Sequence, residues 1–312
     1  MISVIIPVYN EERNIAPLFE RLYPILKGVE SGAVKKDGGY EVLFIDDGSR
    51  DGTAREIEKL RRKDKNVKLL CFSRNFGKSA AMQAGFDEAK GEILILMDGD
   101  LQDIPEEIPK FLAAIKNADV VVGWRYYRED RTTKRLASRI FNSLSGFITG
   151  LRIHDANCGF KALRKEVAKN LELYGEMHRY LPALAYVKGY KVSEIKIRHA
   201  PRLYGRSKYG LSRMWKGFFD LLTVKFLSSF AKRPFHFFGG FGILSFLLGF
   251  IIGAWLFAIW LLTGTIGGHT PAAILSMLLL ILGLQLISLG LIGEMIAATK
   301  ARDRVYEIKR RV

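Results

Sequence analysis

The strongest constraint on the fold is a long stretch without charged residues. Between Pro234 and Gly293 the sequence contains no Lys, Arg, Asp or Glu, which no soluble core requires. Within this stretch, residues 237–263 and 272–298 are each long enough to cross a hydrocarbon layer of about 30 Å as a helix, and residues 264–271 interrupt them. The sequence therefore predicts two transmembrane helices within residues 234–299.

Basic residues flank this stretch on both sides. The formal net charge is +16; residues 196–233 carry ten Lys or Arg against one acid, and the residues after Glu294 carry six against two. Because the connecting loop has no Lys or Arg, the positive-inside rule predicts that both ends of the chain are cytoplasmic. The basic flanks suit anionic membrane lipids as partners. Nucleic acid is not an expected partner, because the charge clusters beside the membrane segment.

Three shorter features complete this membrane part. Residues 210–233 predict an amphipathic interface helix, with aromatic and aliphatic residues on one face and mostly basic ones opposite, although a core helix is the alternative. Residues 300–312 form a basic cytoplasmic tail. The segment Gly249-Phe-Ile-Ile-Gly253 has the small-xxx-small pattern of close helix contacts. It either closes the hairpin on itself or permits a homo-oligomer.

The N-terminal part is expected to be cytoplasmic. Residues 2–7 resemble a strand, without the charged region or cleavage site of a signal peptide. Cys71 and Cys158 are the only cysteines, one in an apolar run and one in a loop. This usage is typical of reduced thiols rather than of a disulfide or a zinc site.

Short apolar runs alternate with amphipathic stretches in the first 125 residues, which indicates an α/β fold with a parallel sheet. We assign residues 1–209 to this domain. The expected strands are 2–7, 41–46, 67–72, 92–97 and 119–123, and the expected helices are about 11–28, 52–64, 78–89 and 105–116. Such sheets bind ligands at the carboxyl ends of their strands.

Polar clusters follow four of these strands, at residues 7–11, 46–53, 73–78 and 98–100. A nucleotide needs a wall for its base and carboxylates for ribose hydroxyls and ring nitrogens. Pro7 and Tyr9 suit the wall, and Asp46 and Asp47 suit the polar contacts. Taken singly, Asn10 and Asp51 also suit helix caps, and Lys78 suits a solvated helix position. The sequence has neither G-x-G-x-x-G after the first strand nor a P-loop, so metal and basic side chains must hold the phosphates.

Two carboxylates stand at the end of the fourth apolar run. Asp98 and Asp100 lie one residue apart, so both can turn toward one hard divalent cation, and Gln102 can add a neutral oxygen. Ordinary turn chemistry is the alternative for an Asp-Gly-Asp segment on its own.

These motifs together resemble the family-two glycosyltransferases of the GT-A fold, and more narrowly the polyprenyl-phosphate glycosyltransferases, the group that contains dolichyl-phosphate mannose synthase and bactoprenol glucosyltransferase. The resemblance covers nearly the whole chain. It rests on residues 7–12, 46–53, 74–78, 98–102, 105–106, 159–162, 204–208 and 290–294.

The resemblance implies a donor site. Asp98, Asp100 and Gln102 would act with Mg²⁺ or Mn²⁺ on the donor diphosphate. The residues implied or expected to contact the donor nucleotide are Pro7, Tyr9, Glu11, Asp46, Asp47, Lys78, Arg202, Ser207 and Lys208. For Arg202 and Lys208, contact with lipid headgroups is the alternative.

Residues 125–139 form a further basic cluster, apart from the basic flanks of the membrane segment. This cluster suits the phosphate of a polyprenyl acceptor. A phosphomonoester is already anionic at neutral pH, so it needs no general base to attack the sugar. The resemblance aligns Arg125 and Ser138 with the acceptor-phosphate residues. Either Lys134 or Arg135 takes the second basic position, and Lys there departs from the usual Arg.

Asp155 matches the family's acid beside the reacting sugar, so we place it with Asp98 and Asp100 among the catalytic residues. Its expected role is to orient acceptor cations or sugar hydroxyls. A simple turn brace is the alternative.

The resulting hypothesis is a membrane-bound, metal-dependent enzyme that transfers one hexosyl unit, with inversion, to dolichyl or undecaprenyl phosphate. UDP-glucose and GDP-mannose are the leading donors. A processive polysaccharide synthase is a rival, but its Gln-x-x-Arg-Trp motif is absent. An inactive, membrane-tethered nucleotide-sugar sensor is the other rival.

Overall fold

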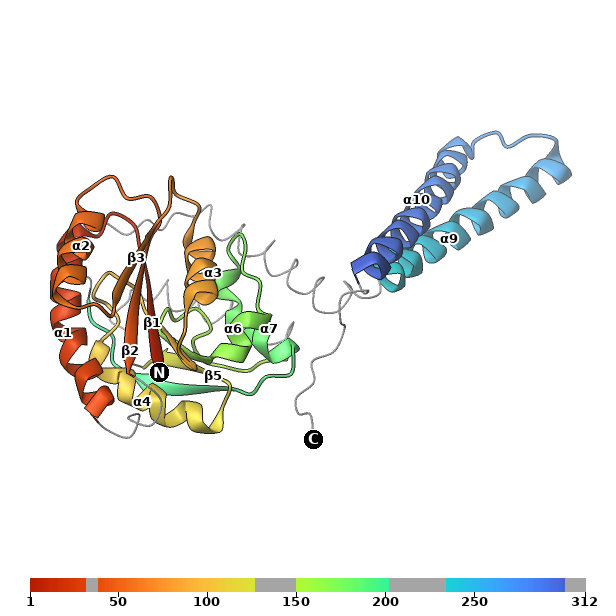
Figure 1. Cartoon of the computed structure of the whole chain (residues 1–312). Helices are drawn as coiled ribbons and strands as arrows, with labels where there is room; N and C mark the ends of the chain where they lie inside the picture. The colour runs from red at the N-terminus through yellow and green to blue at the C-terminus, as the bar shows by residue number, and fades with distance from the viewer. Residues whose placement is uncertain (32–38, 127–149, 202–233, 301–312) are drawn as a thin grey trace. The chain divides into compact units, whose positions relative to one another are not determined.

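The computed structural model describes residues 1–31, 39–126, 150–201 and 234–300. Its contacts divide the chain into two compact units, Met1–Val224 and Lys225–Val312, which are treated separately (Figure 1). The predicted interface helix and the basic tail lie outside the described residues, so both stay predictions.

The first unit is built on a seven-stranded mixed sheet in the order β3-β2-β1-β4-β6-β5-β7. The strands are β1 Ile2–Val8, β2 Tyr40–Asp46, β3 Val67–Cys71, β4 Ile93–Leu96, β5 Val120–Arg125, β6 Lys161–Arg164 and β7 Val192–Ile197. β1 pairs in parallel with β2 and β4, and β5 with β7, whereas β6 runs antiparallel to both β4 and β5.

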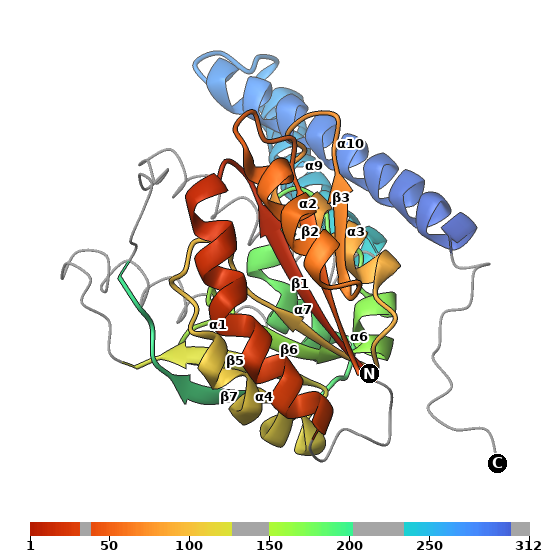
Figure 2. The same ribbon diagram turned by 60° about the vertical axis from the view of Figure 1, so that its left-hand side comes forward.

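Helices cover both faces of this sheet. They are α1 Glu12–Ser31, α2 Thr53–Lys63, α3 Lys78–Glu88, α4 Ile108–Ala114, α6 Lys165–Asn170 and α7 Leu181–Val187, with 3₁₀ turns at Pro105–Glu107, Ile115–Asn117 and Met177–Arg179. Figures 1 and 2 show α1 and α2 on one face, with α3 and α6 on the other. Because β1 and β2 are buried on both faces, they read as nearly continuous apolar runs.

The predicted α/β class is confirmed, and the first five strands lie close to the expected bounds. The expectation of a purely parallel sheet was incomplete, because it omitted β6 and β7. β6 has only four residues and begins and ends with a basic side chain, and β7 carries Glu194 and Lys196. β6 has neither the apolar run nor the clean alternation that marks a strand in a sequence, whereas residues 194–197 of β7 do alternate, a signal that the expected strands left out.

The second unit is a helical hairpin of α9, Pro234–Thr263, and α10, Thr270–Lys300. Both helices are long and apolar enough to cross a membrane, with mean hydropathy 2.3 and 2.4. They begin three and two residues before the predicted spans. Two hydroxyls tie the helices together: Ser245 Oγ donates to Leu279 O at 2.9 Å, and Ser276 Oγ donates to Gly249 O at 2.7 Å.

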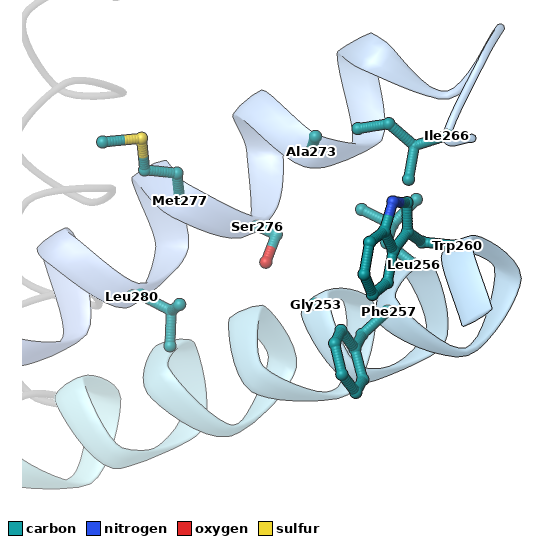
Figure 3. Close-up of a pocket in the computed structure, with 9 residues that line it drawn as sticks. All are labelled: Gly253, Leu256, Phe257, Trp260, Ile266, Ala273, Ser276, Met277 and Leu280. Atoms are coloured by element: carbon teal, nitrogen blue, oxygen red, sulfur yellow. The ribbon is translucent and has the colours of Figure 1, made fainter. Parts of the chain in front are cut away.

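Glycine allows the backbones of the hairpin to approach closely. A Cβ on Gly249 would lie 2.9 Å from Leu280 N and from Ser276 O, and one on Gly253 would lie 3.0 Å from Ser276 Oγ. The small-xxx-small pair thus closes the hairpin on itself. Toward the connecting loop the packing opens into an apolar crevice of about 500 Å³ (Figure 3). It is lined by Gly253, Leu256, Phe257, Trp260, Ile266, Ala273, Ser276, Met277 and Leu280.

We expect Gly249→Ile to destabilise the hairpin by roughly 1–3 kcal/mol, because the new side chain meets backbone atoms of α10 that cannot move aside. Gly240→Ile is the matched control, since nothing lies within 4 Å of a Cβ there. Thermal unfolding in detergent measures both variants. Equal midpoints would contradict the close packing at Gly249.

Candidate active site

The loops that follow β1 and β2 are fastened to each other. Asn10 N donates to Ser49 Oγ, and Arg50 N donates to Asn10 Oδ1, both at 2.9 Å. Glu11 N donates to Thr53 Oγ1 at 2.9 Å. Asn10 has a φ of +55°, which Asn tolerates better than most residues. The side chain of Asn10 thus ties the two loops together and does not cap a helix, which was the alternative considered for it.

The two acids at the end of β2 have different surroundings. Asp46 Oδ1 accepts from Ser49 N at 3.0 Å. Both oxygens of Asp47 accept backbone N–H groups of the loop before α3, from Phe76 at 2.7 Å and from Gly77 at 2.9 Å. Burial nonetheless raises the pKa of Asp47, and the charge of Asp46 adds to the rise. Asp47 thus holds the loop that leads to α3, and its contact with the donor nucleotide stays a prediction.

Pro7 lies within β1, in register with Ile45 of β2, and Tyr9 follows that strand half-buried. Glu11 Oε2 accepts a hydrogen bond from Asn14 Nδ2. The structure therefore gathers Pro7, Tyr9, Glu11 and Asp46 at one edge of the sheet. Their contact with a nucleoside stays a prediction.

Three carboxylates meet in the loop after β4. Asp103 Oδ2 accepts from Asp98 N at 2.9 Å, and Asp100 Oδ1 accepts from Gln102 N at 3.2 Å. Burial and the charges of Asp98 and Asp100 raise the pKa of Asp103 to about 7. Lys78, the first residue of α3, forms an ion pair with Asp98. The loop therefore concentrates more negative charge than this single lysine offsets.

This donor set suits a hard divalent cation. Carboxylate and amide oxygens are what Mg²⁺ and Mn²⁺ prefer, and Gln102 Nε2 lies 3.5 Å from Ala200 O, which orients its amide. Among the described residues, no three His, Cys, Asp or Glu side chains form a complete metal site. Mg²⁺ usually takes one or two carboxylates and completes its shell with substrate phosphates and water. The residues present fit a cation shared with a diphosphate.

Arg125 and Asp155 form a two-pronged ion pair. Arg125 Nε donates to Asp155 Oδ2 at 2.7 Å, and its Nη2 donates to Oδ1 at 2.9 Å. Asp155 is buried at 3% exposure. The structure thus pairs Arg125, predicted to bind the acceptor phosphate, with Asp155, predicted to be catalytic. The role of Asp155 in orienting acceptor cations or sugar hydroxyls stays a prediction. The other predicted acceptor residues, Lys134, Arg135 and Ser138, lie outside the described residues.

The segment before β6 lies against the carboxylate loop. A Cβ on Gly159 would lie 2.7 Å from Asp98 Oδ2, so only glycine leaves room for that carboxylate. Of the residues expected to close over the donor, Arg202, Ser207 and Lys208 fall in the part of the chain that is not described.

Sequence analysis gave no role to Asp103, nor to two further groups at this site. Lys161, the first residue of β6, is 3% exposed. His178 Nδ1 lies 2.9 Å from Ser79 Oγ, across 99 positions of sequence, and Ser79 Oγ also accepts from His178 N at 3.1 Å. The Gly-Phe-Lys segment of the family resemblance could have pointed to Lys161. No spacing signal could have found His178.

We expect Asp47→Ala to lower the free energy of unfolding by roughly 1–3 kcal/mol, because it leaves two backbone N–H groups without their acceptor. Nucleotide affinity should fall as the loop before α3 loosens. Chemical unfolding and calorimetric titration with UDP and GDP measure the two effects. Asp87→Ala, an exposed site on α3, is the control, and equal stability of the two variants would contradict the anchoring role.

His178 predicts a loss of stability in acid. Burial, reinforced by Lys78, lowers its pKa to about 2, whereas an unfolded His has a pKa of about 6.5. Its contribution is therefore present above pH 6.5 and is lost as the pH falls toward 2, at up to about 1.4 kcal/mol per pH unit.

Unfolding of His178→Gln between pH 7.5 and 4.5 should show a shallower dependence on pH than wild type. His269→Gln, an exposed site in the hairpin loop, should follow the wild-type slope. Parallel curves for wild type and His178→Gln would contradict the prediction.

Comparisons with known proteins identify the family of the chain. Residues 3–172 match the family described as glycosyl transferase family 2. A dodecaprenyl-phosphate galacturonate synthase of Rhizobium johnstonii is 36% identical, over 97% of this chain and 89% of that protein. An undecaprenyl-phosphate 4-deoxy-4-formamido-L-arabinose transferase of Shewanella sediminis is 34% identical, over 98% of this chain and 91% of that protein.

A solved structure supports the fold. The glucosyl-3-phosphoglycerate synthase of Mycobacterium tuberculosis, in complex with Mn²⁺ and UDP-glucose, aligns with a TM-score of 0.55 and 18% identity, over 72% of this chain and 78% of that one. The predicted GT-A fold of the first unit is thereby confirmed. By sequence match and by fold, the chain belongs to glycosyl transferase family 2.

Proposed function

We propose that this chain transfers one sugar unit from a nucleoside diphosphate sugar to a polyprenyl phosphate at the cytoplasmic face of a membrane, with inversion at the anomeric carbon. The observation that carries the proposal is the Arg125–Asp155 ion pair, which fixes a guanidinium suited to a phosphate in the same domain as the carboxylate loop. Relatives similar along almost their whole length are named for transfer to polyprenyl phosphates.

On the donor side, Asp98, Asp100 and Gln102 would hold Mg²⁺ or Mn²⁺. When bound, the cation would neutralise the charge that develops on the departing nucleoside diphosphate. Lys78 already pairs with Asp98 and would contact the same phosphates. Pro7, Tyr9, Glu11 and Asp46 would form the nucleoside pocket, together with the loop that Asp47 anchors.

On the acceptor side, Arg125 would hold the phosphate as a two-pronged donor. Asp155 keeps that guanidinium in place, since both of its oxygens already accept from Arg125. The acceptor phosphate is ionised at neutral pH, so the reaction needs no general base. Ser138, with Lys134 or Arg135, would complete the phosphate site, and Arg202, Ser207 and Lys208 would close over the donor.

The sugar is the open part of the proposal. The resemblance of the sequence makes glucose and mannose the leading sugars, whereas the relatives are named for galacturonate and 4-deoxy-4-formamido-L-arabinose. The donor panel must therefore include a uronic acid and a modified pentose beside the two hexoses. The relatives' names likewise favour a dodecaprenyl or undecaprenyl acceptor over a dolichyl one.

The test is transfer of radiolabelled sugar into lipid that organic solvent extracts. Wild type is incubated with undecaprenyl phosphate, Mn²⁺ or Mg²⁺, and UDP-galacturonate, UDP-4-deoxy-4-formamido-L-arabinose, UDP-glucose or GDP-mannose in turn. One donor should give a metal-dependent, acid-labile glycolipid. Asp100→Ala should reduce the rate at least about 100-fold, because the metal supplies several kcal/mol of charge stabilisation.

Asp87→Ala is the matched control and should keep the wild-type rate. Binding of nucleotide without labelled lipid, from any donor, would overturn the proposal in favour of a sensor. Labelled polymer that stays in the aqueous phase would indicate a processive synthase instead.

A further inference from the structure

Lys161 lies between the two parts of the site, the carboxylate loop after β4 and the Arg125–Asp155 ion pair. In the sheet it is in register with Leu96 of β4 on one side and with Val122 of β5 on the other. β4 leads two residues later to Asp98, and β5 ends at Arg125. One side chain thus occupies the junction between the strand that leads to the carboxylates and the strand that carries the acceptor guanidinium.

Burying a lysine at this position costs free energy of folding. Burial lowers the pKa of Lys161 to about 8, and the nearby Asp98 and Asp155 oppose the shift. At pH 7 the side chain is therefore still mostly protonated, although only 3% of the residue is exposed to solvent. A buried charge costs stability that an apolar residue at the same place would not cost. Stability of the sheet alone does not account for this residue.

The contacts of Lys161 lead to both halves of the site. Its ammonium group donates to the carbonyl of Cys158, and Cys158 N donates to Asp155 O at 3.2 Å. Asp155 in turn holds Arg125. Between these residues, Gly159 lies against the carboxylate of Asp98. The turn 155–161 thus touches the carboxylate loop and carries the acceptor ion pair.

We propose that Lys161 is a positioning residue that fixes the turn 155–161, and through it sets Arg125 and Asp155 against Asp98. The inference rests on the proposed function, since it assigns Arg125 to the acceptor phosphate and Asp98 to the donor. Lys161 touches neither substrate in this role. It sets the distance between the acceptor phosphate and the donor sugar, and the rate of a displacement depends steeply on that distance.

The test compares Lys161→Met, which removes the charge and keeps the length, with Lys161→Arg, which keeps the charge. The control is Lys165→Met, because Lys165 Nζ also donates to a backbone carbonyl, that of Lys90 at 3.0 Å, away from the site. We expect Lys161→Met to lower kcat about 10- to 100-fold, as a displacement of about 1 Å can. KM for polyprenyl phosphate should rise, Lys161→Arg should recover part of kcat, and Lys165→Met should match wild type.

Two further readouts separate positioning from a loss of fold. Calorimetric affinity for UDP with Mn²⁺ should change less than about threefold in Lys161→Met, because the expected nucleoside pocket lies on β1 and β2. The effects of Lys161→Met and Asp155→Asn should not add, so that the double variant is little worse than the slower single variant, as for residues that act through one another.

Wild-type kcat in Lys161→Met, or full additivity with Asp155→Asn, would overturn the inference while leaving the proposed function intact. So would an equal loss of nucleotide affinity and of kcat with a lowered unfolding midpoint, which would indicate a purely structural lysine. Failure of wild type and Lys165→Met to label lipid would overturn the proposed function, and this inference with it.

Discussion

Buried charge at the carboxyl ends of the central strands is the constraint on which the rest of the site depends. Asp103, Asp155 and Lys161 are buried and Asp98 and Arg125 are half-buried, and each charge away from water is tolerable only beside an opposite one. Burial raises the pKa of the Asp98 carboxyl, yet Lys78 and Lys161 bring it below its usual range. Removing any one member leaves a charge uncompensated, which makes the group a unit rather than a set of independent contacts.

Contacts between short side chains and the backbone hold the described part of the site together. Asp47 fixes the start of α3 through two backbone N–H groups, and α3 begins with Lys78, the partner of Asp98. Short side-chain contacts therefore connect the end of β2 to the end of β4. A site built from such contacts is organised before substrate arrives, and preorganisation is what lets fixed charges stabilise a developing charge.

The sequence was enough to predict those features that depend on a single helix, strand or loop. Apolar runs located the first five strands and both hairpin helices, and spacing along the chain located Asp98 and Asp100. It was not enough where distant segments meet. β6 is four residues with basic ends, and its place between β4 and β5 follows from tertiary pairing. His178 contacts Ser79 across 99 positions of sequence. Arg125 was assigned to the acceptor phosphate and Asp155 to catalysis, and the sequence did not indicate that they pair.

The two units use glycine for different physical reasons. In the sheet domain Gly159 leaves room for one carboxylate, so its effect is local and concerns charge. In the hairpin Gly249 lets two backbones touch, which matters because lipid offers no hydrophobic drive to bring helices together and close packing must supply the attraction. A larger side chain thus displaces the Asp98 carboxylate in the first case and separates two helices in the second. The first change acts on one charged side chain at constant fold, whereas the second alters the fold of the hairpin itself.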